Sequence, residues 1–264
     1  MPDYNIQHPL AGLFQSAVAQ PLGEFSVACA ISKLLADGDE SPEQLFSDTI
    51  ESLVCAGPTN VTAVLNWFLS QGFSGPQGVV TIAHSDLNFV LEYRQGIPIS
   101  LAVLLLEASR RVGLSGFGVN FPGHFLVNIE DVLIDPLSFT QISEQHLSQM
   151  TKQVGESPHK LLRPATVQMI ALRMLNNIKA QYVVQKNFAN ALEVVDLQLA
   201  SSGDQAELVS SLHFERGEYW QQLGLSAAAH DAYLLCAQRC PYPHLAEKAR
   251  ERAQQIAGND DTFH

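Results

Sequence analysis

The sequence predicts an α+β fold, in which helices lead into one buried helix and a small antiparallel sheet, followed by an all-helical region. Apolar residues recur at helical spacing through much of residues 10–111, at a period near two through residues 117–136, and at helical spacing again after Pro164. The chain has 264 residues, 46% of them hydrophobic and 16% charged, which is the composition of a packed protein with two ordinary domains.

The first part of the chain is predicted to be helical. Apolar positions between residues 10 and 36 indicate two short helices, separated near Pro21. A third helix is expected to have Pro42 in its first turn, where the missing N–H costs nothing, and to end at Gly57, which tolerates a left-handed conformation. We therefore expect residues 1–58 to form an N-terminal helical segment.

The helices that follow lead to one that is predicted to be buried on all sides. A helix is expected to start after the N-cap residue Thr59 or Asn60, and an amphipathic segment comes next. Pro98 then suits the first turn of a helix whose residues 99–106 are almost all apolar, and Gly113 follows its end. Because hardly any face is polar, this helix is expected to have neighbours on every side.

Three short strands are predicted after the buried helix. The segments FGVNF, HFLVNIE and VLIDP have strand-like patterns, and turns are expected at Pro122–Gly123 and at Glu130–Asp131. Short connections of this kind join antiparallel neighbours, so the strands should form a meander. We expect residues 59–160 to be one core, in which the buried helix packs on this small sheet.

After Pro164 the chain is predicted to be wholly helical, with a weak internal repeat. Placing residues 173–200 over residues 211–238 gives an offset of 38. The matched pairs are Tyr182 with Trp220, Phe188 with Ser226, Ala191 with Ala229, and Val195 with Tyr233. A large aromatic residue in one helix and a small alanine in the next favour tight hairpins, as in the tetratricopeptide pattern, whose period is about 34. We expect such hairpins and a capping helix over residues 165–257, and a tail over residues 258–264.

The charge of the chain argues against nucleic acid as a partner. There are 15 Lys and Arg against 27 Asp and Glu, a net charge of −12, so a phosphate backbone would be repelled. The longest apolar run, residues 97–108, is too short to cross a bilayer, and the N-terminus lacks the pattern of a secretory signal. We therefore expect no membrane association and a cytoplasmic protein.

No metal or cofactor motif is found in the sequence. The four cysteines, which form no CxxC pair, are Cys29, Cys55, Cys236 and Cys240. Cys236 and Cys240 are four residues apart on a predicted helix, which leaves a shared metal open, but two small core-facing thiols are the simpler interpretation. Glycine-rich phosphate loops and dinucleotide patterns are absent, so we expect no cofactor.

Ser100, His124 and Asp135 are the residues with the arrangement of a catalytic triad. Ser100 lies in the first turn of the buried helix, where free N–H groups and the helix dipole favour a developing negative charge. His124 and Asp135 fall on strands expected to be adjacent, so the carboxylate would orient the imidazole that takes the serine proton. Each residue also has a structural interpretation: a first-turn serine bonding an amide, a buried His–Asp pair, and a strand-ending turn aspartate.

Several segments resemble the bacterial SirB-type proteins, in which a transglutaminase-like domain is fused to tetratricopeptide-like helices. These segments are DLNFVLEYRQGIPISL, GVNFPGHFLV, LIDP, LRMLNNIKAQYV and ERGEYWQQLG, and they span about residues 60–240. The resemblance implies a papain-like and transglutaminase-like core, a buried helix packed on an antiparallel sheet, followed by the helical repeats.

The resemblance also implies roles for single residues, with one departure. In catalytic members of the superfamily a cysteine opens the buried helix, and a His and an Asp head two consecutive strands, which His124 and Asp135 match. The cysteine position falls at Pro98 to Ser100, and this chain has no cysteine between Cys55 and Cys236. If Pro98 is the match, Ser100 lies roughly 200° further round the helix and points away from His124.

Two functional hypotheses follow. The first is a non-catalytic protein, with a regulatory role as one form of it, whose transglutaminase-like core has lost its nucleophile and whose C-terminal hairpins bind another protein. The alternative is an amide-directed hydrolase or acyltransferase that uses Ser100, His124 and Asp135. The sequence leaves the oligomeric state and the identity of partner or substrate open.

Overall fold

The computed structural model describes residues 23–35, 41–58, 60–203 and 205–260. The first of the two short helices expected between residues 10 and 36 lies outside these residues, as does the last part of the expected tail. The contacts divide the described residues into two compact units, residues 23–174 and residues 175–260. We describe each unit by itself.

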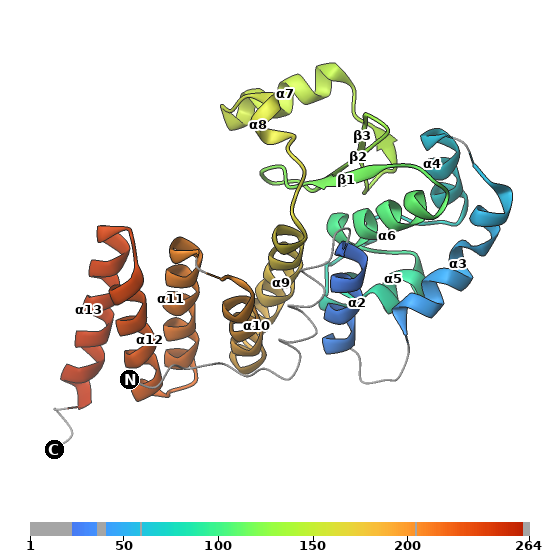
Figure 1. Cartoon of the computed structure of the whole chain (residues 1–264). Helices are drawn as coiled ribbons and strands as arrows, with labels where there is room; N and C mark the ends of the chain where they lie inside the picture. Colours follow the sequence, from blue (N-terminus) through green and yellow to red (C-terminus); the bar gives the residue numbers. More distant parts are fainter. Residues whose placement is uncertain (1–22, 36–40, 59, 204, 261–264) are drawn as a thin grey trace. The chain divides into compact units, whose positions relative to one another are not determined.

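In the described residues, the first unit holds a small sheet and eight complete helices, which lie before or after the sheet in the chain (Figure 1). A ninth helix begins in this unit and continues into the second. Before the sheet lie α2 (Glu24–Leu35), α3 (Pro42–Ala56), α4 (Val61–Ser70), the 3₁₀ helix η1 (Ile82–Ser85), α5 (Leu87–Tyr93) and α6 (Pro98–Arg111). After it come α7 (Glu144–Val154) and α8 (Pro158–Leu161), and then α9 (Val167–Val184) begins. The turn signals act as predicted: Pro42 lies in the first turn of α3, and Gly57 ends that helix in the left-handed conformation.

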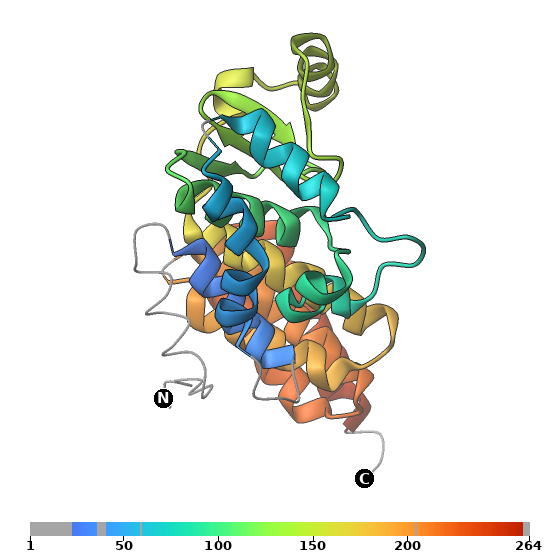
Figure 2. The same ribbon diagram turned by 90° about the vertical axis from the view of Figure 1, so that its right-hand side faces the viewer.

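Helix α6 is buried on every side, as its sequence predicts. Residues 99–106 are all buried, and α6 contacts α2, α3, α4 and α5 as well as the first two strands. Figure 1 shows α6 between the sheet and helices α2 and α5, and in Figure 2 α3 and α4 lie on the side that faces the viewer. Arg110, in the last turn of α6, pairs with Glu24 of α2 and, at 2.7 Å, with Glu107 of its own helix.

The sheet is an antiparallel meander of four strands in the order β1-β2-β3-β4. The strands are β1 (Gly116–Val119), β2 (Leu126–Ile129), β3 (Val132–Asp135) and β4 (Thr140–Gln141). Glu130 and Asp131, with φ of 48° and 62°, form the two-residue turn between β2 and β3. Positive φ at both positions matches the right-handed twist of the strands, which explains the tight hairpin.

The two faces of the sheet are covered by different helices. A side chain built at Gly116 would meet Leu106 of α6 and Ile129 of β2, so Ile129 lies on the face toward α6. The opposite face packs with α7 through a cluster formed by Val119, Phe121, Leu126, Leu133 and Met150. The layers of this unit are therefore α7, the sheet, α6, and the helices α2 and α5 (Figure 1).

The second unit consists of helices that repeat with the predicted offset. It holds the last part of α9, then α10 (Phe188–Ser201), α11 (Ala206–Gln222), α12 (Ser226–Arg239) and α13 (Pro243–Asp260). Helices α9 and α11 end 38 residues apart, and α10 and α12 begin 38 residues apart. Lys186 and Gly224, also 38 residues apart, have positive φ values of 56° and 74° in the two turns. The two helix pairs thus share their spacing and a residue with positive φ in the turn, while their tetratricopeptide identity stays a prediction.

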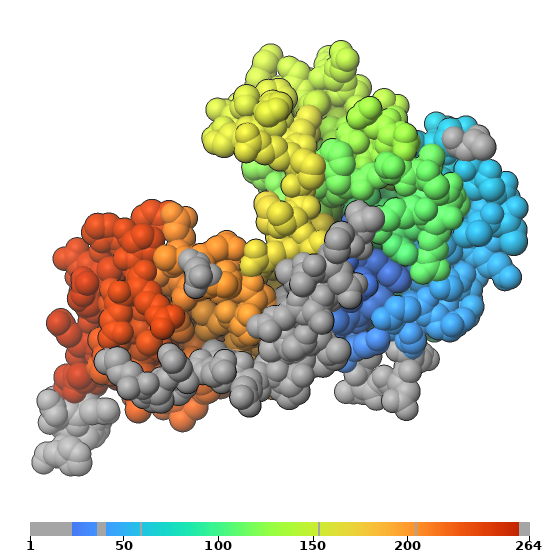
Figure 3. Space-filling model, in the orientation of Figure 1, coloured from blue at the N-terminus to red at the C-terminus, as the bar shows by residue number. Residues whose placement is uncertain are grey.

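Small residues allow α11, α12 and α13 to pack closely. Their core contains Phe214, Ala229, Tyr233, Cys236, Ala237, Ala249, Ala253 and Ile256. A Cβ atom at Gly217 would lie 2.6 Å from the Tyr233 ring, so this ring requires glycine opposite it. Cys236 is a buried core thiol and Cys240 is half-buried. In Figure 3 the side chains of α11 to α13 close over the space between these helices.

A row of polar groups, of which Lys179 and Gln198 are buried, joins α9, α10 and α11. The Lys179 ammonium donates to Gln198 Oε1 at 2.8 Å and pairs with Glu215 at 2.5 Å, and Gln198 Nε2 donates to Asn176 Oδ1 at 2.8 Å. Lys179 is only 7% exposed, so its charge depends on these partners. The row therefore fixes which residues of the three helices lie opposite one another.

The observed division differs from the expected domain boundaries. Helices α2 and α3 pack with α6 in the first unit, and the boundary between the two units falls inside α9, between Met174 and Leu175. Helix α13 continues to Asp260, beyond the expected end at residue 257. None of the helices described is both long and apolar enough to cross a membrane.

Candidate functional site

The start of α6 is held in place by its connection to the preceding loop. The N–H of Gly96 donates to the Ser74 carbonyl at 3.2 Å, and the N–H of Ile97 donates to the His84 carbonyl at 3.1 Å. Ile97 is the N-cap in an extended conformation, and Pro98 is the first helical residue. Pro98 thus occupies the opening position of the buried helix, and its ring nitrogen offers neither a proton nor a nucleophile.

Ser100 lies in the first turn of α6 and is completely buried. Its relative exposure is 0%, and its Oγ has no hydrogen-bond partner in the described part of the chain. Ile99 and Leu101 on either side are buried as well. A hydroxyl in this position is closed off from both solvent and a base, although a nucleophile needs access to each.

His124 lies on the surface, two residues before β2. Its backbone N–H donates to the Phe121 carbonyl at 3.0 Å, which closes the turn through Pro122 and Gly123. The imidazole is exposed and stands edge-on to the Phe121 ring, with 6.2 Å between the ring centroids. Among the residues that the structure describes, no side chain forms a hydrogen bond with the His124 ring.

Asp135, at the end of β3, caps its own turn. Its carboxylate accepts hydrogen bonds from the Leu137 N–H at 2.9 Å and from the Ser138 hydroxyl at 3.0 Å. Ser138 is in turn 2.7 Å from the Thr140 hydroxyl at the start of β4. An aspartate at the end of a strand commonly stabilises the following turn through such hydrogen bonds.

The register of the sheet shows which way Asp135 points. Val127 pairs with Ile134, so Leu126 lies opposite Asp135 when the register is continued by one residue. Leu126 and Leu133 belong to the cluster on the face toward α7, and Asp135 shares that face because side chains alternate along a strand. Helix α6 covers the other face. In this structure, therefore, no hydrogen bond joins any two of Ser100, His124 and Asp135.

Arg173 is a residue at this site that the sequence did not single out. From α9 it donates to Asn120 Oδ1 at 2.6 Å and to the Phe121 carbonyl at 3.4 Å, and its guanidinium lies 5.8 Å from the centroid of the Phe125 ring. Burial lowers the pKa of the Arg173 guanidinium below its usual value. Arg173 thus holds the loop that carries His124, and nothing in its local sequence indicated so distant a contact.

Comparison with known proteins places this chain in a family. Residues 38–176, more than half of the chain, match the model of the transglutaminase-like superfamily. A UPF0162 protein of Xylella fastidiosa strain Temecula1 is 31% identical over 209 residues, which are 71% of this chain and 71% of that protein. The chain belongs to the transglutaminase-like superfamily, in the family of SirB1 and the UPF0162 proteins. The expected SirB-type resemblance and the α+β fold are thereby confirmed.

Two further relatives of this family match the chain over different lengths. Protein SirB1 of Salmonella typhimurium strain LT2 is 23% identical over 244 residues, covering 84% of this chain and 89% of SirB1. The UPF0162 protein PA3419 of Pseudomonas aeruginosa is 33% identical over 183 residues, covering 66% of this chain and 65% of that protein. No solved structure matches the chain.

Within residues 23–35, 41–58, 60–203 and 205–260, no three His, Cys, Asp or Glu side chains come together in a group that could hold a metal ion. What the site does combine is an exposed imidazole, a turn-capping carboxylate and a buried, unpartnered hydroxyl. The three residue types of a triad are therefore present, but the hydrogen bonds that would link them are not seen among these described residues.

Proposed function

We propose that this chain is a non-catalytic member of the transglutaminase-like superfamily that acts by binding another protein. The observation that carries the proposal is the state of Ser100: the hydroxyl is fully buried and unpartnered, at the start of a helix that opens with proline. His124, which would have to take the serine proton, is exposed and makes no side-chain hydrogen bond among the described residues.

Chemical reactivity supports the same conclusion. A thiol is partly ionised near neutral pH and needs modest activation, whereas an alcohol needs a well-aligned base and donors for the oxyanion. Helix α6 supplies first-turn N–H groups, but Ser100 has no base within hydrogen-bonding distance. Loss of the cysteine is therefore not compensated by the serine.

The second unit supports a binding role. Short helical hairpins present side chains from successive helices and turns, a common way to recognise another polypeptide. Large apolar side chains that lie exposed in this unit are Val184, Leu223, Leu225 and Tyr242. We propose that the partner binds to this unit rather than to the site around His124.

Labelling with a fluorophosphonate probe tests the non-catalytic assignment. The unaltered protein and Ser100→Ala should react equally weakly, because the hydroxyl is not activated. Ser109→Ala is a matched control, since Ser109 is also fully buried on α6 with an unpartnered Oγ. Labelling that disappears in Ser100→Ala and in His124→Ala, but persists in Ser109→Ala, would replace this proposal with the serine hydrolase or acyltransferase.

A further inference from the structure

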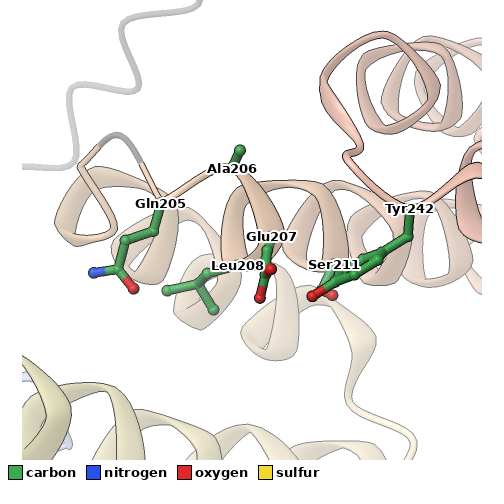
Figure 4. Close-up of a pocket in the computed structure, with 6 residues that line it drawn as sticks. All are labelled: Gln205, Ala206, Glu207, Leu208, Ser211 and Tyr242. Atoms are coloured by element: carbon green, nitrogen blue, oxygen red, sulfur yellow. The ribbon is translucent and has the colours of Figure 1, made fainter.

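A hollow lies between the start of α11 and the residue that precedes α13. Its volume is about 510 Å³, and it is lined by Gln205, Ala206, Glu207, Leu208, Ser211 and Tyr242. Figure 4 shows the Tyr242 ring reaching back along α11 toward Ser211 and Glu207, with Leu208 and Gln205 beyond Glu207. Residues from two parts of the chain therefore meet around one space.

The backbone of Tyr242 is held by its neighbours, and the residue is half exposed. It lies between Pro241 and Pro243, which fix the backbone on both sides. Its carbonyl accepts the Ala246 N–H at 3.0 Å and the Cys240 thiol at 3.4 Å. The side chain is 50% exposed. A tyrosine side chain has only two χ angles and therefore loses little conformational entropy when it binds, which suits a recognition residue.

Glu207 supplies an anionic group beside this ring. The Tyr242 hydroxyl donates to the Glu207 carboxylate, and this bond raises the pKa of Tyr242. Within the described part of the chain, no Lys or Arg forms an ion pair with Glu207. Glu207 lies in the first turn of α11.

The combination of these groups selects a cation. The face of a tyrosine ring attracts a positive charge, a carboxylate accepts charge-assisted hydrogen bonds, and the Ser211 hydroxyl adds a further acceptor. Leu208 and Ala206 offer apolar surface to the methylene stem of a long basic side chain. The N-terminus of α11 repels a cation, because the helix dipole places about half a unit of positive charge there. The full negative charge of Glu207 is larger, so attraction outweighs this repulsion.

Among biological cations, guanidinium fits these groups best. It is planar, stacks on an aromatic ring, and presents a fork of N–H donors that one carboxylate accepts through both oxygens. An ammonium group is a compact point charge that holds its water more strongly and cannot stack.

We infer that this hollow binds an arginine side chain of a partner polypeptide. The inference rests on the proposed binding role of this unit and makes it more specific: the partner presents arginine to the side of α11 that carries Glu207 and Ser211. The net charge of −12 of the chain assists the approach of such a partner.

Titration of the unaltered protein with model peptides tests the inference. The probes are blocked five-residue peptides of glycine and serine with one central arginine, citrulline or lysine, followed by ligand-observed NMR. Citrulline has the shape of arginine without its charge. The arginine peptide should bind roughly fivefold or more tightly than the citrulline peptide, with lysine between them. Equal binding of arginine and citrulline, or tighter binding of lysine, would overturn the inference.

Variants locate the binding to the hollow. Glu207→Gln keeps the shape and a hydrogen-bond acceptor, and it should remove the preference for arginine over citrulline. Tyr242→Phe should keep most of the affinity and Tyr242→Leu should lose it, because the ring face is what the cation needs. Glu247→Gln, at an exposed position on α13, is the matched control and should bind as the unaltered protein does. An arginine preference that survives Glu207→Gln would place the site elsewhere.

The outcome is independent of the labelling experiment. If the arginine preference is absent while Ser100 stays unlabelled, this inference fails and the non-catalytic assignment stands. If Ser100 is labelled, the non-catalytic assignment fails whatever the peptides do.

Discussion

The hydroxyl of Ser100 sits among apolar side chains without a hydrogen bond in the described part of the structure. Leaving a buried polar group unpaired costs about 1–3 kcal/mol, and native proteins keep few such groups. An active enzyme keeps a destabilising group of this kind because catalysis requires it. In a site without a base, it remains as a cost to stability only.

Ser100→Ala is therefore expected to stabilise the protein. Removing the unpaired hydroxyl and gaining helix propensity should raise the free energy of unfolding by about 1 kcal/mol. Chemical denaturation followed by circular dichroism measures the change. Ser109→Ala, with the same burial on the same helix, should give a gain of the same sign. A clear loss of stability in Ser100→Ala alone would mean that the hydroxyl has a partner outside the described residues.

At the scale of elements, the turns of the two helical hairpins need the same left-handed backbone conformation at matching positions, which are occupied by different residues. Lys186 in the turn after α9 and Gly224 in the turn after α11 both have positive φ, and they match at the offset of 38. Glycine adopts this conformation freely, whereas a residue with a Cβ atom is strained by roughly 1–2 kcal/mol. The Lys186 side chain is exposed, so packing does not compensate for this strain.

Lys186→Gly should accordingly raise the free energy of unfolding, by roughly 0.5–1 kcal/mol after the greater freedom of glycine in the unfolded chain is allowed for. The reciprocal change, Gly224→Ala, should lower it by about 1 kcal/mol. Denaturant titrations of both variants check the pair of signs. Lys186→Ala separates the backbone effect from loss of the charge, and it should leave stability nearly unchanged.

The elements that could be predicted are those with local signals. Pro42 and Gly57 bound α3, Pro98 and Gly113 flank α6, and alternating residues gave the strands, because each signal acts on the backbone next to it. Local signals could not predict whether the candidate site residues come together. An all-apolar α6 implies that Ser100 is buried, but whether Ser100 meets His124 depends on how α6 packs on the sheet.

The unpredicted features all depend on long-range contacts. Asp135 caps its own turn, which was one of its two interpretations, but the face of the sheet that it occupies depends on the pairing of β3 with β2, which directs its side chain toward α7 rather than α6. Arg173 contacts Asn120 across more than fifty residues, and Glu207 meets Tyr242 only because α11 and α13 both pack on α12. Sequence patterns carry little trace of such pairs, because each partner taken alone looks like an ordinary surface residue.

At the scale of the whole molecule, the chain consists of two compact units that carry one tryptophan each. Trp67 of α4 belongs to the first unit and Trp220 of α11 to the second. Trp67→Phe and Trp220→Phe variants therefore give fluorescence that reports on one unit at a time. With such reporters, a perturbation confined to one unit can be assigned to it.

Acid should destabilise the second unit selectively, through His213. This residue of α11 is buried, 7% exposed, and burial together with the charges of Arg216 and Arg239 lowers its pKa to about 4. The folded unit thus prefers neutral His213, while the unfolded chain protonates near pH 6.5. The stability that neutral His213 contributes is complete above that pH and is lost as the pH falls toward 4, by at most about 3 kcal/mol.

We expect the denaturation midpoint seen by Trp220 to fall between pH 7 and pH 4.5 more steeply than the midpoint seen by Trp67. His213→Leu keeps the volume and removes the titrating group, so it should flatten the pH dependence of the Trp220 signal while leaving the Trp67 signal unchanged. His230→Asn, at a half-exposed position on α12, is the control and should keep the steep dependence. Carboxylates elsewhere also titrate at the lower end of this range. The deciding quantity is therefore the slope of the Trp220 denaturation midpoint against pH above pH 5, compared between His213→Leu and the control. Equal slopes there would show that His213 is charged or solvated in the folded unit.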